Sequence, residues 1–474
     1  YEFAFGSKRA RRRSPIFGAP DGPAAALPKK RKETAMDLKE TYTSNLAPCK
    51  IPSPVINRAE GANHISFVSD ADRILIDLNV QRACKQMEEG FDPPSYELAG
   101  PRQHIFFDPS KLKCALVTCG GLCPGLNDII RSIVLELHYG YGLRNTFGVR
   151  YGLRWFIPGY GYDMMPLTPK AVVNIHERGG VVIGSSRGPQ DIEEIVDTLE
   201  RMGIGIVFMI GGDGTLRAAT SIVDTVAKRG LKIGIVGVPK TIDNDIQLVS
   251  RTFGFDTAVE VSTRAIVSAS NEAEGYPNGI GLIKLMGRES GFIAATATLA
   301  QQDVNFVLIP EVDFDLEGPN GLLASLEKRL SDRGHAVIVA AEGAGQKFFA
   351  NEPKELDLSG NVKLKDIGLF LKQRMLSYFE ARGVQGTIKY IDPSYMIRSL
   401  PANANDRVFC NFLGRNAVHA GMAGKTDLLI GNWNNHFVHV PMKLLAGKRK
   451  HVDPKGMLWR SALEATGQGS LKNG

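Results

Sequence analysis

Two apolar segments rich in β-branched residues, 205–210 and 232–238, are each followed at once by a polar turn. Neither segment alternates between apolar and polar residues, which is typical of strands buried on both faces of a parallel sheet. The turns read Gly-Gly-Asp-Gly-Thr from Gly211 and Lys-Thr-Ile-Asp-Asn-Asp from Lys240. Because ligands in open α/β sheets gather beyond the carboxyl ends of the strands, we expect both turns to lie at one binding site.

The same alternation of strand, loop and helix recurs along most of the chain. Further strands are expected at 113–118, 279–285, 305–309 and 335–341. Helices are expected between them at 128–138, 191–202, 291–301 and 319–330. This order predicts an α/β fold with doubly wound parallel sheets. At 474 residues the chain holds too many such units for one core, so we expect two similar lobes.

The N-terminal residues, 1–40, are rich in Ala, Pro, Gly, Lys and Arg without an apolar period, which predicts disorder. Residues 1–35 contain nine Lys and Arg against three acids, so +6 of the net charge of +7 belongs to this tail. The tail could be a nuclear-targeting signal, a polyanion-binding arm, a solvated tail or a cloning remnant. The rest of the chain is near neutral, which argues against a folded body that binds nucleic acid.

Residues 41–108 lack the strand–loop–helix pattern, and we expect an N-terminal extension wrapped over the core with one helix near 70–87. No apolar run reaches the roughly 20 residues that a membrane span needs. The first residues also lack the apolar region of a signal peptide. The six cysteines form no paired CxxC spacing, which favours reduced thiols and a cytoplasmic location.

The turns that begin at Gly211 and Lys240 supply the groups that phosphoryl transfer needs. The first offers backbone N–H groups to phosphate oxygens and the Asp213 carboxylate to Mg²⁺, although Asp213 could instead only cap a helix. The positive charge of Lys240 would stabilise the negative charge that develops near the transferred phosphate. Asp243 is the best candidate for a general base, because an attacking alcohol must lose its proton to a group within hydrogen-bond reach.

Five further loops carry glycine, arginine or carboxylate residues: 119–127, 179–188, 286–292, 342–343 and 390–398. Taken singly, each is a weak signal that a tight turn or a surface ion pair would also explain. The first of them fits neither the GxGxxG nor the GxxxxGK[ST] pattern, so it predicts neither a dinucleotide fingerprint nor a P-loop.

Eight motifs follow one another along the chain: GGLCPG, GSSRG, GGDGT, PKTIDND, RTFGFDTA, KLMGRESGF, AEG and KYIDPSYMIR. In this order they resemble the 6-phosphofructokinase family over roughly residues 108–445, which implies two lobes of Rossmann-like build. The resemblance implies transfer of a phosphoryl group to the C1 hydroxyl of fructose 6-phosphate, the committing step of glycolysis. It further implies a nucleotide-binding lobe at 109–247 plus about 415–460, a sugar-phosphate lobe at 248–414, and an allosteric homo-oligomer, a tetramer by family habit.

The resemblance also assigns the site residues. It implies that Asp243 is the base, with Lys240 and Arg288 as the other catalytic residues. It implies Mg²⁺ at Asp213 and the nucleotide on Gly121, Arg187, Gly212, Asp213, Gly214 and Thr215. It implies fructose 6-phosphate on Thr241, Ile242, Asp243, Asp245, Met286, Gly287, Arg288, Glu342, Tyr395 and Arg398.

Two positions give opposite indications of the phosphoryl donor. Lys240 before Thr-Ile-Asp is a feature of the family's pyrophosphate-using branch, but pyrophosphate users carry a second aspartate where Gly214 stands. Because glycine leaves room for an α-phosphate, we expect ATP as co-substrate, with pyrophosphate as the alternative. The combination resembles ATP-dependent enzymes of plants, trypanosomatids and some bacteria. NAD and lipid kinases also use GGDGT-like turns, but they would not need Tyr395 and Arg398.

Overall fold

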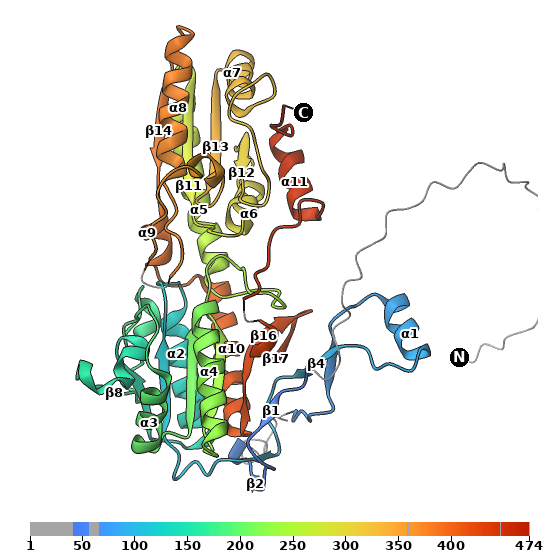
Figure 1. Ribbon diagram of the computed structural model, residues 1–474, viewed down its shortest axis with the longest axis vertical. Helices are drawn as coiled ribbons and strands as arrows, with labels where there is room; N and C mark the ends of the chain where they lie inside the picture. The colour runs from blue at the N-terminus through green and yellow to red at the C-terminus, as the bar shows by residue number, and fades with distance from the viewer. Residues whose placement is uncertain (1–40, 56–65, 358–359, 446, 474) are drawn as a thin grey trace, which may run out of the picture. The chain divides into compact units, whose positions relative to one another are not determined.

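The computed structural model describes residues 41–55, 66–357, 360–445 and 447–473, which belong to one compact unit, Asp37–Gly474. The predicted basic tail, residues 1–40, lies outside the described residues. The described chain builds two separate large sheets, each covered by helices (Figure 1). The expected α/β fold with two lobes is confirmed.

The first sheet has nine strands in the order β3-β4-β17-β16-β10-β9-β6-β7-β8. The stretch from β16 to β7 is parallel, while every pairing outside it is antiparallel, so the sheet is mixed rather than purely parallel. Its strands are β3 (Arg73–Leu75), β4 (Ser95–Leu98), β6 (Cys114–Thr118), β7 (Thr146–Val149), β8 (Met164–Pro166), β9 (Ile206–Gly211), β10 (Gly234–Pro239), β16 (Leu428–Trp433) and β17 (His436–Pro441).

The second sheet has four strands, all parallel, in the order β12-β13-β11-β14. They are β11 (Gly279–Leu285), β12 (Phe306–Leu308), β13 (His335–Ala341) and β14 (Thr387–Ile391). Helices that pack on the first sheet or on each other beside it are α2 (Leu126–Leu135), α3 (Ile192–Met202), α4 (Asp213–Lys228) and α10 (Ala404–Met422). Those of the second sheet are α5 (Phe255–Glu274), α6 (Phe292–Ala300), α7 (Leu322–Arg333), α8 (Ile367–Ala381) and α11 (Met457–Thr466), and the short α9 (Ser394–Arg398) follows β14.

Strand β11 shows why these segments are continuously apolar. Ile280 and Leu282 belong to the core cluster that contains α7 and α8, while Ile283 and Leu285 belong to the cluster that contains α5 and α6. Both faces of the strand are therefore covered, and successive side chains point alternately into two apolar layers. Each fully buried Leu or Ile contributes about 1.5–3 kcal/mol, so a polar residue at either face would be costly.

The N-terminal extension adds strands to the first sheet and forms two small sheets, each of two strands. Strand β1 (Ser44–Asn45) pairs with β15 (Lys425–Thr426), and β2 (Ile51–Pro52) pairs with β5 (His104–Ile105). Strands β3 and β4 extend the first sheet beyond β17.

The helix expected near 70–87 is wrong in its first half, because residues 73–75 form β3 and the helix is α1 (Val80–Glu88). Two side chains stop the helix from beginning earlier. The amide of Asn79 donates to Asp77 Oδ1 at 2.9 Å, and Asn79 Oδ1 accepts from the amide of Arg82 at 3.1 Å. These local bonds satisfy backbone groups that a longer helix would use.

The predicted division into a nucleotide lobe and a sugar-phosphate lobe stays a prediction. Helix α10, which begins at Ala404, contacts β10 and α2, and α11 contacts α6 and β12.

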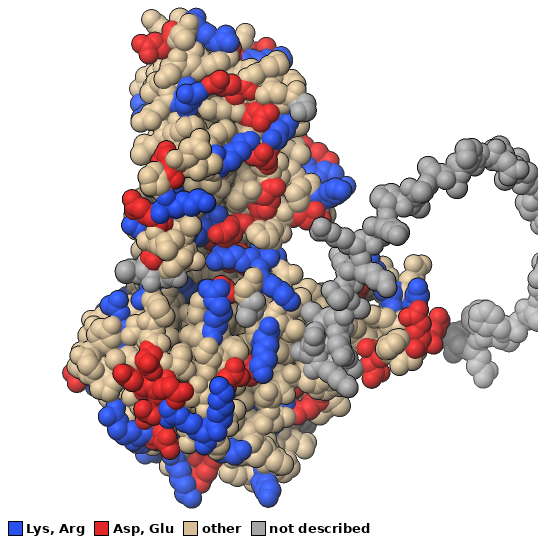
Figure 2. Space-filling model, viewed as in Figure 1, with Lys and Arg blue, Asp and Glu red and all other residues tan. Residues whose placement is uncertain are grey.

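Within the described ranges, no helix combines the length and apolar character required to cross a bilayer. Acidic and basic side chains are interspersed over the face shown in Figure 2, in keeping with a near-neutral body.

Candidate active site

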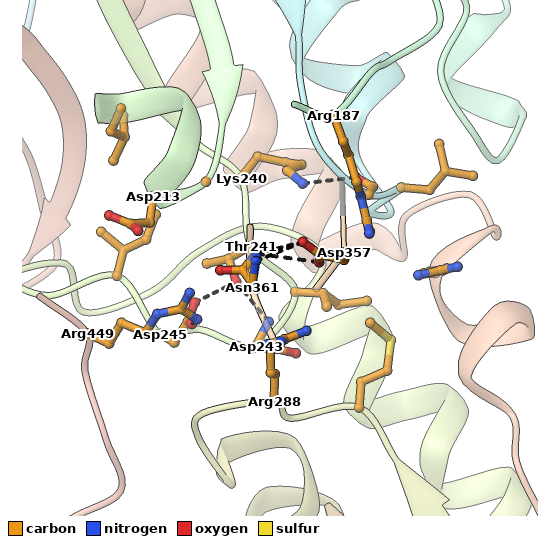
Figure 3. A pocket seen from close by; sticks show the side chains of 18 of the residues that line it. Arg187, Asp213, Lys240, Thr241, Asp243, Asp245, Arg288, Asp357, Asn361 and Arg449 are labelled. Carbon is orange, nitrogen blue, oxygen red and sulfur yellow. Dashed lines mark hydrogen bonds and ion pairs between the residues drawn. The ribbon is translucent and has the colours of Figure 1, made fainter. Parts of the chain in front are cut away.

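The carboxyl ends of the two sheets face a shared cavity of about 270 Å³ (Figure 3). The loops after β6, β9 and β10 line it from the first sheet, and those after β11 and β13, with α9, line it from the second. A second cavity of about 490 Å³ adjoins it along the start of α4. The residues that line both cavities are Arg187, Gly212, Asp213, Lys240, Asn361 and Arg449.

The predicted nucleotide residues lie around the junction of the two cavities. Gly214 and Thr215, in the first turn of α4, line the second cavity. A Cβ built on Gly214 would meet no atom within 4 Å, so this position opens into free space. A Cβ on Gly121 would lie 3.1 Å from Arg187 Nη2 and 3.9 Å from Arg398 Nη1, so the glycine lets two guanidinium groups approach one backbone segment.

Asp213 is the first residue of α4, and its carboxylate is mostly buried. Oδ2 lies 3.0 Å from Arg217 Nη1, and Oδ1 accepts from the amide of Gly447 at 3.3 Å. The residues that the structure describes contain no cluster of three or more His, Cys, Asp or Glu side chains that could hold a metal ion by themselves. A single carboxylate fits Mg²⁺ that arrives with phosphate groups, because this ion takes one or two carboxylates and completes its shell with water and phosphate oxygens.

Lys240 reaches from the end of β10 to the loop after β6. Its side chain is buried, and Nζ donates to the carbonyl of Gly121 at 2.9 Å. Gly120 has a φ of +90°, and a Cβ there would lie 2.9 Å from Lys240 Nζ, so both its backbone and its neighbour favour glycine. Burial lowers the pKa of the lysine, while its ammonium is held where the two cavities meet.

The turn after β10 is held by its own side chains. Thr241 Oγ1 donates to Asp245 Oδ1 at 2.7 Å and accepts from the amide of Asp243 at 3.2 Å. Asn244 has a φ of +55°, a left-handed conformation that asparagine tolerates, and its Oδ1 accepts from the amide of Thr252 at 3.1 Å. These bonds fix where the Asp243 carboxylate lies.

Asp243 has the most perturbed carboxylate in the cavity. Oδ1 is buried and has no hydrogen-bond partner among the described residues. Burial, and then the nearby carboxylates of Asp245 and Glu342, raise its pKa to about 8, while the amide of Arg288 acts in the opposite direction. A carboxylate whose pKa lies close to neutral pH is suited to accept a proton during a reaction.

The second sheet contributes the predicted sugar-phosphate residues. Met286 and Arg288 follow β11, and Glu342 follows β13. Arg288 Nη2 donates to the carbonyl of Val362, and burial raises the pKa of Glu342 above its ordinary value. Arg398 completes this side from the end of α9.

Gly287 and Tyr395 are the two predicted residues that line neither cavity. The carbonyl of Gly287, whose φ is +131°, accepts from the amide of Gly343 at 3.0 Å. Tyr395 is 74% exposed, and the guanidinium carbon of Arg398 lies 4.5 Å from the centre of its ring. The first therefore shapes a turn, and the second can orient an arginine by a cation–π contact.

Four polar or charged residues that line the first cavity escaped the sequence analysis: Asp357, Asn361, Lys448 and Arg449. The first two lie in the irregular loop before α8, where no period or motif marks them; the amide of Asn361 donates to Asp357 Oδ1 at 3.0 Å. The other two belong to a short basic run, Lys448-Arg449-Lys450, which the sequence shows but which no neighbouring strand pattern singles out.

Comparison with known proteins places the chain among phosphate-transferring enzymes. The family model described as "Phosphofructokinase" matches residues 113–421. An ATP-dependent 6-phosphofructokinase of Borreliella burgdorferi is 49% identical over 93% of this chain and 99% of the relative, and ATP-dependent 6-phosphofructokinase 7 of Arabidopsis thaliana is 47% identical over 79% and 77%. A solved pyrophosphate-dependent phosphofructokinase of Marinobacter aquaeolei has the same fold, with a TM-score of 0.61 at 19% identity over 75% of this chain and 91% of that one.

Proposed function

The chain belongs to the phosphofructokinase family, and from that premise we propose that it transfers the γ-phosphoryl group of ATP to fructose 6-phosphate. The products are ADP and fructose 1,6-bisphosphate. The observation that carries the proposal is the position of the buried Asp243 carboxylate, which lines the first cavity together with Arg288 and Glu342, while Gly214 and Thr215 line the adjoining second cavity. Pyrophosphate is the alternative donor, and the likeness to the two ATP-dependent relatives favours ATP.

The proposed reaction is a direct displacement at phosphorus. The C1 hydroxyl oxygen of the sugar forms a bond to the γ-phosphorus, the bond from that phosphorus to the bridging oxygen of ADP breaks, and Asp243 accepts the hydroxyl proton. Arg288 and Arg398 bind the phosphate of the sugar. The positive charges of Lys240 and Arg187 stabilise the negative charge on the transferred phosphoryl group. The buried ammonium of Lys240 needs little reorganisation to do so, which is the usual source of electrostatic catalysis.

Several finer assignments are part of the same proposal. Mg²⁺ would be held by Asp213 and would neutralise charge on the β- and γ-phosphate oxygens. A cytoplasmic location rests on the cysteine spacing, and a homotetramer and allosteric control rest on the family resemblance alone. Binding of polyanions by the basic tail rests on its charge of +6, and the near-neutral body is not proposed to bind nucleic acid.

The direct test of this function is product analysis with purified protein, Mg²⁺, ATP and fructose 6-phosphate. We expect ADP and fructose 1,6-bisphosphate in equal amounts, and little product when pyrophosphate replaces ATP. Fructose without its phosphate should be a poor acceptor, because Arg288 and Arg398 would lose their charged partner. Equal use of fructose and fructose 6-phosphate, or faster turnover with pyrophosphate, would contradict the proposal.

The pH dependence of the reaction provides a separate prediction. Because Asp243 must be deprotonated to act as a base and its pKa is raised to about 8, kcat/KM for fructose 6-phosphate should fall as the pH drops below about 8. Asp245→Asn removes one of the charges that raise this pKa, so the acid limb of the profile should move to lower pH. The control is Asp332→Asn, an exposed aspartate paired with Lys328, which should leave the profile unchanged. If the acid limb of Asp245→Asn stays in place or moves to higher pH, Asp243 is not the group whose pKa sets this limb.

A further inference from the structure

The chain crosses from the first sheet to the second beside the cavity. After β17 it forms a short turn, Met442–Leu444, continues through residues 447–452, here called the crossing segment, and then enters α11. The amide of Gly447 donates to Asp213 Oδ1, and the amide of Lys450 donates to the carbonyl of Asp245 at 2.8 Å. The crossing segment therefore bonds to the two turns that carry the predicted metal ligand and base.

Its own side chains divide between anchoring and facing the cavity. Lys450 Nζ donates to the carbonyls of Val249 and Ser250 at 2.8 and 3.1 Å and to Asn244 Oδ1 at 3.2 Å, and burial lowers its pKa to about 8. The amide of Val452 donates to Glu311 Oε1 at 2.7 Å. Lys450 and the backbone thus anchor the segment without help from Arg449.

Arg449 is directed toward the reacting groups instead. Its side chain lines both cavities and is 28% exposed, and Nη1 lies 3.0 Å from Asp245 Oδ2. In the view of Figure 3 it enters from the side opposite Arg187, with Lys240 and Thr241 drawn between them. Among the described residues, only Nη1 of this guanidinium has a hydrogen-bond partner, which leaves the other N–H groups of its planar fork for a ligand.

We propose that Arg449 is a further catalytic residue, whose guanidinium binds the phosphoryl group as it passes from the nucleotide to the sugar. The inference rests on the proposed function. A group in transfer spreads its charge over three oxygens, and a planar guanidinium can contact two of them at once. Asp245 orients the arginine through one N–H group, and Arg187 and Lys240 act on the same group from other sides of the junction.

The test compares Arg449→Gln and Arg449→Lys with the wild type, using ATP and fructose 6-phosphate. Arg449→Gln should lower kcat roughly 10- to 100-fold, as expected for the loss of one positioned donor, while KM for fructose 6-phosphate changes less than about twofold. Arg449→Lys should recover part of the loss because it restores charge but not the fork. The matched control is Arg460→Gln, an exposed arginine of α11 paired with Glu464, which should behave as wild type.

A chemical rescue separates catalysis from structure. Arg449→Ala should lower kcat to the same degree as Arg449→Gln, and millimolar guanidinium chloride should restore part of its turnover while leaving Arg460→Gln unaffected. Wild-type kcat in Arg449→Gln, or a loss that follows a lowered Tm and is not rescued, would overturn the inference. A wild type that does not phosphorylate fructose 6-phosphate with ATP would instead overturn the proposed function. The proposed function is thus tested in the wild type, and the role of Arg449 is tested in its variants.

Discussion

Gly214→Asp is expected to lower kcat/KM for ATP by about 10³-fold without disturbing the fold. A Cβ at this position would meet no atom within 4 Å, and Gly214 lines the second cavity from the first turn of α4. An acid in the first turn of a helix is favourable for the helix itself. It would nevertheless place a negative charge in the cavity proposed to hold the nucleotide phosphates, and two like charges about 4 Å apart repel by about 4 kcal/mol at an effective dielectric of 20.

Steady-state kinetics with both donors measure this effect. Gly214→Ala adds bulk without charge, so it should retain most ATP turnover, and comparison with Gly214→Asp isolates the electrostatic part. The lysine that is a feature of the family's pyrophosphate-using branch is already present as Lys240. Gly214→Asp is therefore expected to gain weak activity with pyrophosphate. Undiminished use of ATP by Gly214→Asp would show that this position does not select the donor.

The elements that the sequence predicted well are those with continuous apolar runs. Strands β9 and β10 are such runs, and the polar turns directly after them had to lie at the same edge of a parallel sheet. Strand β3 (Arg73–Leu75) could not be recognised, because its partner β4 begins twenty residues later and three residues carry no period. Its short apolar content was therefore assigned to the neighbouring helix.

The candidate site divides in the same way. Asp213 and Lys240 follow buried strands directly, and both line the cavities. Arg449 and Asn361 come from irregular segments whose position is set by tertiary contacts, so no local pattern could place them. The same holds for the pKa of Asp243, because burial and two carboxylates from distant or adjacent turns raise it.

Asp243→Asn is expected to lower kcat by about 10³-fold, within the usual range for loss of a positioned base. The same change should stabilise the fold at high pH. The pKa of the folded-state carboxyl, about 8, lies above its ordinary value of 3.8, so the stability that its protonated form contributes is fully present below about pH 3.8 and is lost progressively as the pH rises to about 8. At pH 9 the wild type therefore carries a buried, unfavourable charge that asparagine lacks.

Two measurements together test whether Asp243 is the base and whether burial and nearby carboxylates destabilise its ionised form. Single-turnover kinetics should show the loss in the chemical step, with KM for fructose 6-phosphate little changed. Thermal unfolding should give Asp243→Asn a higher Tm than wild type at pH 9, and the difference should shrink toward pH 5, where the wild-type carboxyl is protonated. Asp332→Asn, at an exposed ion pair, should show neither effect. If Asp243→Asn turns over normally while its Tm rises at pH 9, the carboxyl is buried as described but another group accepts the proton.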